Sequence, residues 1–518
     1  MRLRYVKVAT MLGAVCLLIG TVGGCPLSSL FPQAPEPNCP EPNTAEPNTP
    51  EPNTPEPNTP EPNATTKTVH EKIFTEILSS PDFEGTSTCL NCHSNHARNI
   101  LETQHWNWSA EIQNIPAAEG ETHGKVDIIN AFCISIPSNE GRCSQCHPSY
   151  GWRDDTFDFT DIANIDCLIC HDGTGTYRKH PTDGGGGGAP ALLVDGEVVP
   201  VTDMSELNPV AYSVSPPKRQ NCGLCHFYAG GGDNVKHGDL SSALAEATED
   251  LDVHMGGQDF SCQTCHTETD HQILGTTEYS GAEGIVSCQS CHTDRPHSGM
   301  LGSLLNLHLE RVACQTCHIP TFARGVATKL EWYWDEAGQD GVTPDEQYGR
   351  ETYDKKKGRF VWGMDVKPVF RWHNGKWFKR VIGVNDTYTE AGTVDDPILI
   401  CGPVATADDA DAKIYPFKEF KGTQPVDPVN KRLVVPHLFG TAAGPSPYWA
   451  EFNWDAAISE GTAYAGQDYS GTYDFAHTVS YLSLNHEIAP ATEARQCEDC
   501  HGVDSFWEQL GISDPFGS

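Results

Sequence analysis

The residues with the clearest chemical meaning form one motif, Cys-x-x-Cys-His, which occurs eight times along the chain. Two cysteines followed directly by a histidine are the attachment signature of c-type haem, in which both thiols bind the porphyrin and the imidazole binds the iron. A single copy would also suit zinc, but eight copies in one chain indicate haem. The sequence therefore predicts eight covalently bound haems c.

We number the haems 1 to 8 in the order of their motifs. The predicted attachment residues are sixteen of the 21 cysteines: Cys89 and Cys92, Cys143 and Cys146, Cys167 and Cys170, Cys222 and Cys225, Cys262 and Cys265, Cys288 and Cys291, Cys314 and Cys317, and Cys497 and Cys500. The motif histidines are His93, His147, His171, His226, His266, His292, His318 and His501.

Further histidines could supply the second axial ligand of each iron. Of the 22 histidines, fourteen lie outside the motifs, and nine of these lie near a motif or among apolar and aromatic residues: His96, His105, His237, His254, His271, His297, His308, His477 and His486. Each is a candidate distal ligand, the alternative being a hydrogen bond to a haem propionate. His70, beside a proline-rich tract, and His373, beside an Asn-Gly turn, look like surface residues.

The elements that position these residues are expected to be short. A haem is a large flat apolar body that replaces side-chain core, so we predict a multihaem cytochrome c with mainly short α-helices and loops around eight haems. Helices are expected from Cys92 towards Trp106 and within residues 299–318. Aromatic and β-branched runs around Asn374-Gly375 predict a small β-hairpin insertion.

The chain divides by composition into segments. Residues 1–24 resemble a signal peptide of a bacterial lipoprotein, which would leave Cys25 lipidated; an ordinary secretory signal is the alternative. Residues 25–66 repeat Pro, Glu, Asn and Thr and predict an extended linker. The octahaem domain would span 67–518, with seven motifs in 67–320, a β-containing insertion in 321–496 and the eighth motif in 497–518.

The strongly acidic composition limits the partners of the protein. A formal net charge of −36 excludes nucleic acid as a partner and would repel anions at long range. An anionic substrate would therefore need a locally positive channel, for which Arg178, Lys179, Lys218 and Arg219 are candidates. Calcium occurs in some multihaem enzymes, but no loop of this sequence has convincing ligand spacing for calcium.

Several stretches carry a resemblance to the octahaem tetrathionate reductase family of c-type cytochromes, from about residue 80 to the C-terminus. They are "NAFCISI", "CLICHDGTGTYRKHP", "NCGLCHFYAGGGDNVKHGDL", "VACQTCHIPTFARG", "YDKKKGRFVWGMDVKPVFRWHNG" and "SYLSLNHEI". The resemblance implies seven haems with two histidine ligands and an active-site haem 2 that takes Lys236 in place of His147. The tract "DGGGGGAPALLVDGEVVP" looks like an insertion relative to the family.

The same resemblance assigns Asn130, Cys133 and Asp233 to the pocket of haem 2. A Cys133 thiolate would attack a sulfur–sulfur bond or steer a sulfur ligand, and Asn130 would donate hydrogen bonds. Asp233 would handle protons or fix Lys236. A lysine binds iron only as the neutral amine, which a ferric centre favours.

These expectations define three functional hypotheses. The first is a reductase that passes electrons along the bis-histidine haems to haem 2 and reduces tetrathionate, nitrite or hydroxylamine. The second is an electron-transfer conduit without a substrate, and the third is oxidation of a reduced nitrogen compound such as hydroxylamine. The expected redox partner is a quinol-linked or small cytochrome c donor, and membrane contact would occur only through the lipid anchor at a periplasmic or cell-surface location.

Overall fold

The computed structural model describes residues 67–180, 188–275, 286–502 and 506–512. All of them belong to one compact unit. The predicted signal peptide, Cys25 and the proline-rich linker lie outside the described residues. Within the described ranges, no helix is long and apolar enough to cross a membrane.

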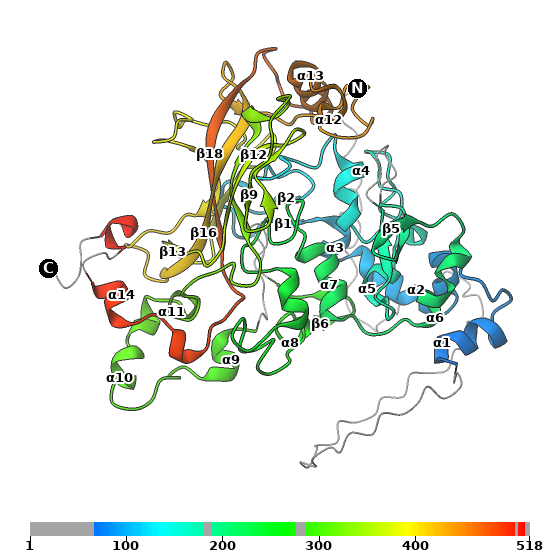
Figure 1. Cartoon of the computed structure of the whole chain (residues 1–518), viewed down its shortest axis with the longest axis horizontal. Helices are drawn as coiled ribbons and strands as arrows, with labels where there is room; N and C mark the ends of the chain where they lie inside the picture. Colours follow the sequence, from blue (N-terminus) through cyan, green and yellow to red (C-terminus); the bar gives the residue numbers. More distant parts are fainter. Residues whose placement is uncertain (1–66, 181–187, 276–285, 503–505, 513–518) are drawn as a thin grey trace, which may run out of the picture. The chain divides into compact units, whose positions relative to one another are not determined.

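Short helical turns carry the haem motifs (Figure 1). Because the two cysteines and the histidine are spaced i, i+3 and i+4, one helical turn places all three on the same face. Seven motifs lie on or directly beside α2 (Thr86–Leu101), α5 (Leu168–His171), α7 (Arg219–His226), α8 (Cys262–Cys265), α9 (Cys288–His292), α11 (Cys314–His318) and α14 (Cys497–His501). The second motif differs, because it begins at Cys143, the last residue of α4 (Glu140–Cys143), continues in a 3₁₀ turn (Ser144–Cys146) and ends with His147 in an extended conformation.

The remaining helices are also mostly short. They are α1 (Val69–Lys72), α3 (Gln104–Asn107), α6 (Asn208–Tyr212), α10 (Gly302–Leu305), α12 (Tyr448–Glu451) and α13 (Trp454–Tyr464). The helices predicted after Cys92 are present as α2 and α3. The helices predicted within residues 299–318 are present as α10, a 3₁₀ turn at His308–Glu310 and α11.

Small antiparallel sheets lie among the haem motifs. They pair β1 (Ser109–Glu111) with β2 (Thr122–Gly124), and β6 (Glu268–Thr269) with β7 (Gln272–Ile273). A three-stranded sheet orders β3 (Tyr177–Lys179), β4 (Pro190–Val194) and β5 (Glu197–Pro200). The last two of these strands are formed by the described part of the glycine-rich insertion, residues 188–200.

A large sheet lies between the seventh and eighth motifs in the sequence. Its main path runs β11 (Tyr353–Asp354), β12 (Gly358–Gly363), β8 (Thr328–Tyr333), β16 (Lys413–Asp427), β18 (Asp474–Ser483), β15 (Ile398–Pro403) and β14 (Trp377–Lys379). Two further strands, β13 (Val369–His373) and β17 (Arg432–Leu433), pair with β16. A separate pair joins β9 (Glu346–Gln347) to β10 (Arg350–Glu351).

This sheet is more extensive than the predicted hairpin. The Asn374-Gly375 dipeptide does form a tight turn, with Gly375 at φ +85°. The strands on either side of it do not pair with each other, however, because β13 pairs with β16 and β14 pairs with β15. The 15-residue strand β16 offers a longer ladder than a local hairpin would, so a distant partner replaces the adjacent one.

The main hydrophobic core attaches the large sheet to the loop before the second motif. Trp332, in β8, and Trp334, directly after β8, are fully buried, and their ring centres are stacked 4.9 Å apart. The Trp334 indole N–H donates a 3.0 Å hydrogen bond to the Phe132 carbonyl. Phe132 also packs on Phe420 of β16, with ring centres 4.8 Å apart. The sheet thereby fixes the loop that contains Asn130 and Cys133.

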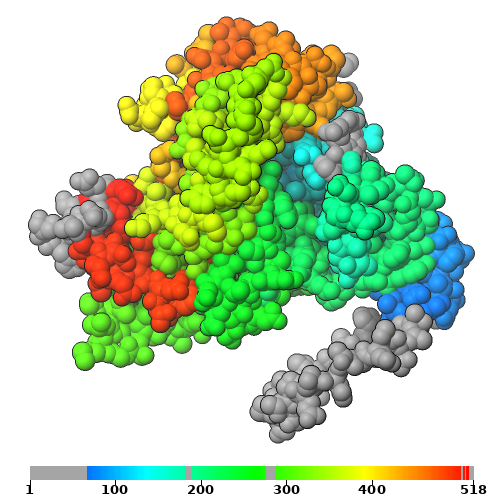
Figure 2. Space-filling model, in the orientation of Figure 1, coloured from blue at the N-terminus to red at the C-terminus, as the bar shows by residue number. Residues whose placement is uncertain are grey.

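The C-terminal motif is held against the seventh. The backbone N–H of Arg495 donates to the Cys317 carbonyl at 3.0 Å, and its guanidinium donates to the Pro320 carbonyl at 2.8 Å. In Figure 2 the segment with α14, in red, lies against the green segment that contains α10 and α11.

Candidate haem sites and active site

Seven of the eight motif histidines face a second histidine. The separations between ring centres fall between 6.0 and 6.4 Å for all seven pairs: His93 with His70, His171 with His271, His226 with His105, His266 with His486, His292 with His254, His318 with His297, and His501 with His308. The partners in most pairs come from distant parts of the sequence, so tertiary packing sets these pairs.

The spacing of these pairs fits an iron between the two rings. Two metal–nitrogen bonds of roughly 2 Å, plus the distance from each nitrogen to its ring centre, accommodate separations of 6.0–6.4 Å. Several rings also use Nδ1 for a protein hydrogen bond, which leaves Nε2 for a metal. The Nδ1 atoms of His171 and His266 lie 3.0 Å from the carbonyls of Ser215 and Leu274, respectively.

Six of the nine candidate distal ligands face a motif histidine: His105, His254, His271, His297, His308 and His486. His70, which the sequence indicated as a surface residue, lies opposite His93 instead. Its place on α1, directly after the linker, is known only from the structure.

The other three candidates lie elsewhere. His96 is exposed and lies 5.6 Å from the His93 ring and 5.5 Å from the His271 ring, so it is beside two pairs rather than opposite a motif histidine. His477 lies on β18, where its backbone N–H bonds the Gly392 carbonyl. His237 is partly buried, desolvation places its pKa well below the usual value, and no ring pairing with a motif histidine is present among the described residues.

Contacts between motif cysteines reveal the order of the haem sites. Four pairs of thiols from different motifs are within hydrogen-bonding contact: Cys89 with Cys167, Cys146 with Cys225, Cys222 with Cys262, and Cys288 with Cys314. Three more pairs of motifs have thiols close enough to interact electrostatically, as shown by Cys170 with Cys222, Cys265 with Cys291, and Cys317 with Cys500. The sites therefore follow the order 1–3–4–5–6–7–8, and site 2 branches from site 4.

His147 is the one motif histidine with both ring nitrogens bonded to protein atoms. Its Nε2 contacts the Trp106 carbonyl and its Nδ1 lies 2.6 Å from the Ser149 hydroxyl. Since a carbonyl only accepts, Nε2 must carry the proton, and Nδ1 then accepts from Ser149. Burial lowers the pKa of His147 to about 3, so the ring is neutral. A protonated Nε2 cannot bind iron.

The surroundings of His147 explain this orientation. The ring is completely buried among Trp106, Trp108, Trp152 and two phenylalanines, with ring centres 4.8 to 6.1 Å away. His147 also precedes Pro148, which disfavours the helical conformation in the residue before it. Its ψ of 135° follows from that restriction and directs the ring away from the helical turn. Only this motif is followed by proline, a signal visible in the sequence.

The loop with Asn130 and Cys133 adjoins the loop with Asp233 and Lys236. A Cβ atom on Gly231 would lie 3.9 Å from the Cys133 sulfur, so the glycine allows close approach of the two loops. Asn130 does not point freely into a pocket, because its Oδ1 accepts from the Phe132 N–H at 2.9 Å and stabilises its own turn.

The second loop is anchored at several points. Asp233 accepts from the backbone N–H and the hydroxyl of Ser242 at 2.9 and 2.5 Å, and lies 3.8 Å from the guanidinium of Arg350. The buried Lys418 ammonium of β16 donates to the carbonyls of Val235 and Lys236. Lys236 interacts electrostatically with His226, and Cys225 contacts Cys146, so Lys236 lies near the junction of sites 2 and 4.

Cations surround Cys133. Burial raises the pKa of the Cys133 thiol, and the opposing charges, in decreasing order, are those of Lys357, Lys329 and Arg142. Only 4% of Lys329 is exposed, and its ammonium lies 3.9 Å from the ring centre of Trp332 and 3.3 Å from that of Phe360. Among the described residues it has no hydrogen-bonded or ion-paired partner. Desolvation lowers the pKa of Lys329 well below its usual value.

Three of the four cations that the sequence suggested for a substrate channel donate hydrogen bonds to backbone carbonyls of the protein. The Lys179 ammonium is buried and donates to the carbonyls of His147 and Ser149, with Asp166 3.6 Å away. Arg219 donates to the carbonyls of Met255 and Phe260. Arg178 donates to the Gly175 and Tyr177 carbonyls beside it. The cations near Cys133 come instead mainly from the strands and turns of the large sheet.

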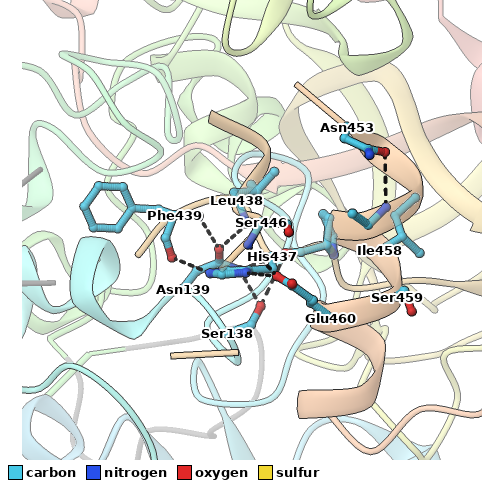
Figure 3. Close-up of polar contacts among 12 residues, drawn as sticks. Ser138, Asn139, His437, Leu438, Phe439, Ser446, Asn453, Ile458, Ser459 and Glu460 are labelled. Atoms are coloured by element: carbon cyan, nitrogen blue, oxygen red, sulfur yellow. Dashed lines mark hydrogen bonds and ion pairs between the residues drawn. The ribbon is translucent and has the colours of Figure 1, made fainter. Parts of the chain in front are cut away.

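A buried polar network fixes the residues before the second motif (Figure 3). Asn139 accepts from the backbone N–H groups of Leu438 and Phe439 at 2.7 and 3.2 Å and donates to the Pro436 carbonyl at 3.1 Å. His437 in the same segment contacts Glu460 of α13 at 2.9 Å. The start of α4 is therefore held by residues almost 300 positions later in the chain.

Comparisons with known proteins identify cytochromes c that are similar to this chain. Residues 329–504 match the family model described as bacterial cytochrome c, and residues 247–319 match the model of cytochrome c7 and related cytochromes c. The crystal structure of an octaheme cytochrome c from Shewanella oneidensis is similar, with a TM-score of 0.75 and 39% identity; the match covers 86% of this chain and 98% of that one. An uncharacterized protein from Archaeoglobus fulgidus is 22% identical over 253 residues, which cover 39% of this chain and 80% of that protein.

Proposed function

The chain belongs to the octahaem c-type cytochromes, and from this premise we propose that it is a reductase in which seven bis-histidine haems deliver electrons to haem 2. The family resemblance and the covalent haem c cofactors predicted from the motifs are confirmed by the octaheme relative and the cytochrome c family models. A redox role follows from these cofactors, because haem iron transfers single electrons.

The observation that supports a special role for haem 2 is the pair of hydrogen bonds to His147. Seven motif histidines face a second histidine, whereas the ring nitrogens of His147 bind Trp106 and Ser149. Another residue must therefore supply the proximal ligand of haem 2. We assign this role to Lys236, whose loop Lys418 anchors to the sheet and which lies near the junction of sites 2 and 4. When bound there, haem supplies electrons and a coordination position for a substrate.

The residues near Cys133 favour a small anionic substrate. Lys357 provides positive charge near Cys133 in a protein that is otherwise strongly acidic, and a bound anion would favour the protonated form of the buried Lys329 amine. Tetrathionate suits this site: two electrons cleave its central sulfur–sulfur bond and release two thiosulfate ions. Cys133 would steer the sulfur atoms, and Asp233 would hold the loop of Lys236 through Ser242. Nitrite and hydroxylamine are further candidate substrates because both bind haem iron and accept several electrons.

Two other functions remain as alternatives to the reductase. A conduit would contain only haems that are closed to exogenous ligands, and an oxidase of reduced nitrogen compounds would use the same site in the opposite direction. The branched position of site 2, off the path through the other seven sites, favours a terminal site over a conduit.

The proposal includes the setting of the protein. The lipoprotein-like start of the chain would place the haem domain outside the cytoplasm, with Cys25 as a lipid anchor and the linker as a spacer. A quinol-linked or small cytochrome c donor would reduce the bis-histidine haems.

Low-temperature electron paramagnetic resonance of the haem-loaded protein and of Lys236→Ala tests the proposal. We expect nitrite or cyanide to alter one haem signal in the wild type, and expect the variant to lose this haem's ligand signature and at least about 100-fold in tetrathionate reduction. Lys421→Ala, which removes an exposed lysine paired with Glu419, is the matched control and should behave as the wild type. If no haem of the wild type binds either anion, the protein is a conduit.

A further inference from the structure

Lys179 is buried beside the turn that follows the second haem motif. Its ammonium donates to the carbonyls of His147 and Ser149, and the Asp166 carboxylate lies 3.6 Å away. Only 5% of Lys179 is exposed, although the sequence suggested this residue for a substrate channel. A bound haem can only increase this burial. The Lys179 charge therefore lies in the protein interior rather than in a solvent-filled channel.

The two carbonyls belong to a three-residue turn centred on Pro148. The Ser149 N–H donates to the His147 carbonyl at 2.7 Å, so this oxygen accepts from both the turn and Lys179. One ammonium reaches both carbonyls only when they point towards the same place. Rotation of His147 from its ψ of 135° to the helical value of about −40° would turn its carbonyl to the opposite side and break the contact. Lys179 therefore stabilises the extended conformation of His147 over the helical one.

This conformation distinguishes the second motif from most of the others. Each of five other motif histidines is the last residue of a helix: His171, His226, His292, His318 and His501. In the second motif the chain leaves the helical turn at His147, and the Ser149 hydroxyl lies 2.6 Å from the His147 Nδ1 atom. With Nδ1 accepting from Ser149, Nε2 keeps its proton on the Trp106 carbonyl. Lys179 thus acts on the imidazole through the position of Ser149.

The support of Lys179 is itself anchored to the segment before the third motif. Lys179 ends β3, and Tyr177 of the same strand donates its hydroxyl to Asp166 at 2.8 Å. The backbone N–H of Asp166 donates to the Pro148 carbonyl at 2.9 Å. A buried ion pair is weak evidence for stability, since apolar residues of similar volume often serve as well. The role of the Lys179–Asp166 pair is therefore sought in the conformation that it selects.

We propose that Lys179 is a positioning residue that keeps the His147 imidazole from binding the iron of haem 2, which leaves this coordination position to Lys236. The inference rests on the proposed ligand set of haem 2. Competition between the two ligands makes such a restraint necessary. At pH 7 most of a free imidazole is neutral, whereas a lysine amine is largely protonated and must lose its proton before it binds iron. A released His147 would therefore bind iron in preference to Lys236.

Resonance Raman spectroscopy of the reduced, haem-loaded protein tests the proposal. A ferrous haem with one histidine and an open sixth position gives an iron–histidine stretching band, whereas six-coordinate bis-histidine haems and a lysine-ligated haem do not. We expect no such band in the wild type, a band in Lys179→Met and none in Lys179→Met/His147→Gln. The band should correspond to about half of haem 2 or more. The matched control is Lys379→Met, which alters a lysine of β14 with a similar exposed fraction, 3%, and should give the wild-type spectrum.

The outcomes separate this inference from the ligand assignment on which it rests. A band in the wild type that His147→Gln abolishes would show that His147 binds iron, and both would fail. If fully loaded Lys179→Met lacks the band, or if the band persists in the double variant, the role of Lys179 alone is overturned.

Lys179→Gln provides a second test, because its shorter side chain cannot span both carbonyls but remains polar. Haem content by mass spectrometry accompanies each spectrum. If neither Lys179 variant takes up its full set of haems, Lys179 acts in folding rather than in the choice of ligand, and the proposal is overturned.

Discussion

The Nε2 atom of His147 is bonded to the carbonyl of Trp106, so the histidine of the second haem motif already uses this nitrogen for a hydrogen bond within the protein. We expect His147→Gln, which keeps hydrogen-bonding groups, to leave the axial-ligand signals of all eight haems unchanged. His171→Gln is the control, because His171 faces His271, and it should produce a new high-spin ferric signal. Electron paramagnetic resonance with haem content measured by mass spectrometry checks both. A new high-spin signal in His147→Gln would contradict the assignment.

The distal ligand of haem 1 is expected to be His70 rather than His96. His70→Gln should convert one low-spin haem into a high-spin haem, because His70 lies 6.4 Å from the His93 ring centre. His96→Gln should not, since the exposed His96 lies beside that pair. Low-temperature electron paramagnetic resonance of the two variants distinguishes them, and the reverse result would exchange the two roles.

Lys329 is expected to select anions at the Cys133 site. Lys329→Met should raise KM about tenfold for tetrathionate and nitrite, and change it little for uncharged hydroxylamine, because a bound anion favours the protonated form of this buried amine, whose pKa is otherwise lowered by desolvation. Lys329→Arg should retain most of the affinity for anions. Lys355→Met is the control, because Lys355 is paired with Asp340 at 2.6 Å on the surface. Steady-state kinetics check this, and equal effects on all three substrates would refute it.

Asn139 is expected to contribute strongly to stability. Asn139→Ala should lower the free energy of unfolding by about 2–4 kcal/mol, because it leaves the buried N–H groups of Leu438 and Phe439 without their acceptor. Asn374→Ala, which removes one bond in a surface turn, should cost less than about 1 kcal/mol. Chemical denaturation followed by circular dichroism provides the comparison, and similar losses in the two variants would argue against the network in Figure 3.

Glu140 makes stability depend on pH. Desolvation raises its pKa from 4.5 to about 7 in the folded protein, so the folded state binds its proton more tightly than the unfolded state does. Ionisation therefore reduces stability as pH rises from about 4.5 to 7, and the loss persists above this range. Glu140→Gln should stabilise the protein by up to about 3 kcal/mol at pH 8 and by little at pH 4. Denaturant titrations at the two pH values check this, and a difference independent of pH would show that Glu140 has an ordinary pKa.

The fold was predictable where local rules govern it. The i, i+3, i+4 spacing of each motif needs only one helical turn, and the helices after Cys92 formed as expected. The β region was less predictable. The Asn374-Gly375 turn is local, but the partners of its two strands are β16 and β15, whose pairing depends on the whole sheet.

The sequence by itself determined the cofactors, because each covalent haem attachment site lies within five consecutive residues. The sequence also indicates that the second motif is unusual, because His147 is the only motif histidine that is followed by proline. Tertiary structure alone decided which histidines face each other: His486 meets His266 across more than 200 residues, and His70 meets His93. The reason is physical, since axial ligands must approach from opposite sides of a plane, and only the packing of distant loops brings them there.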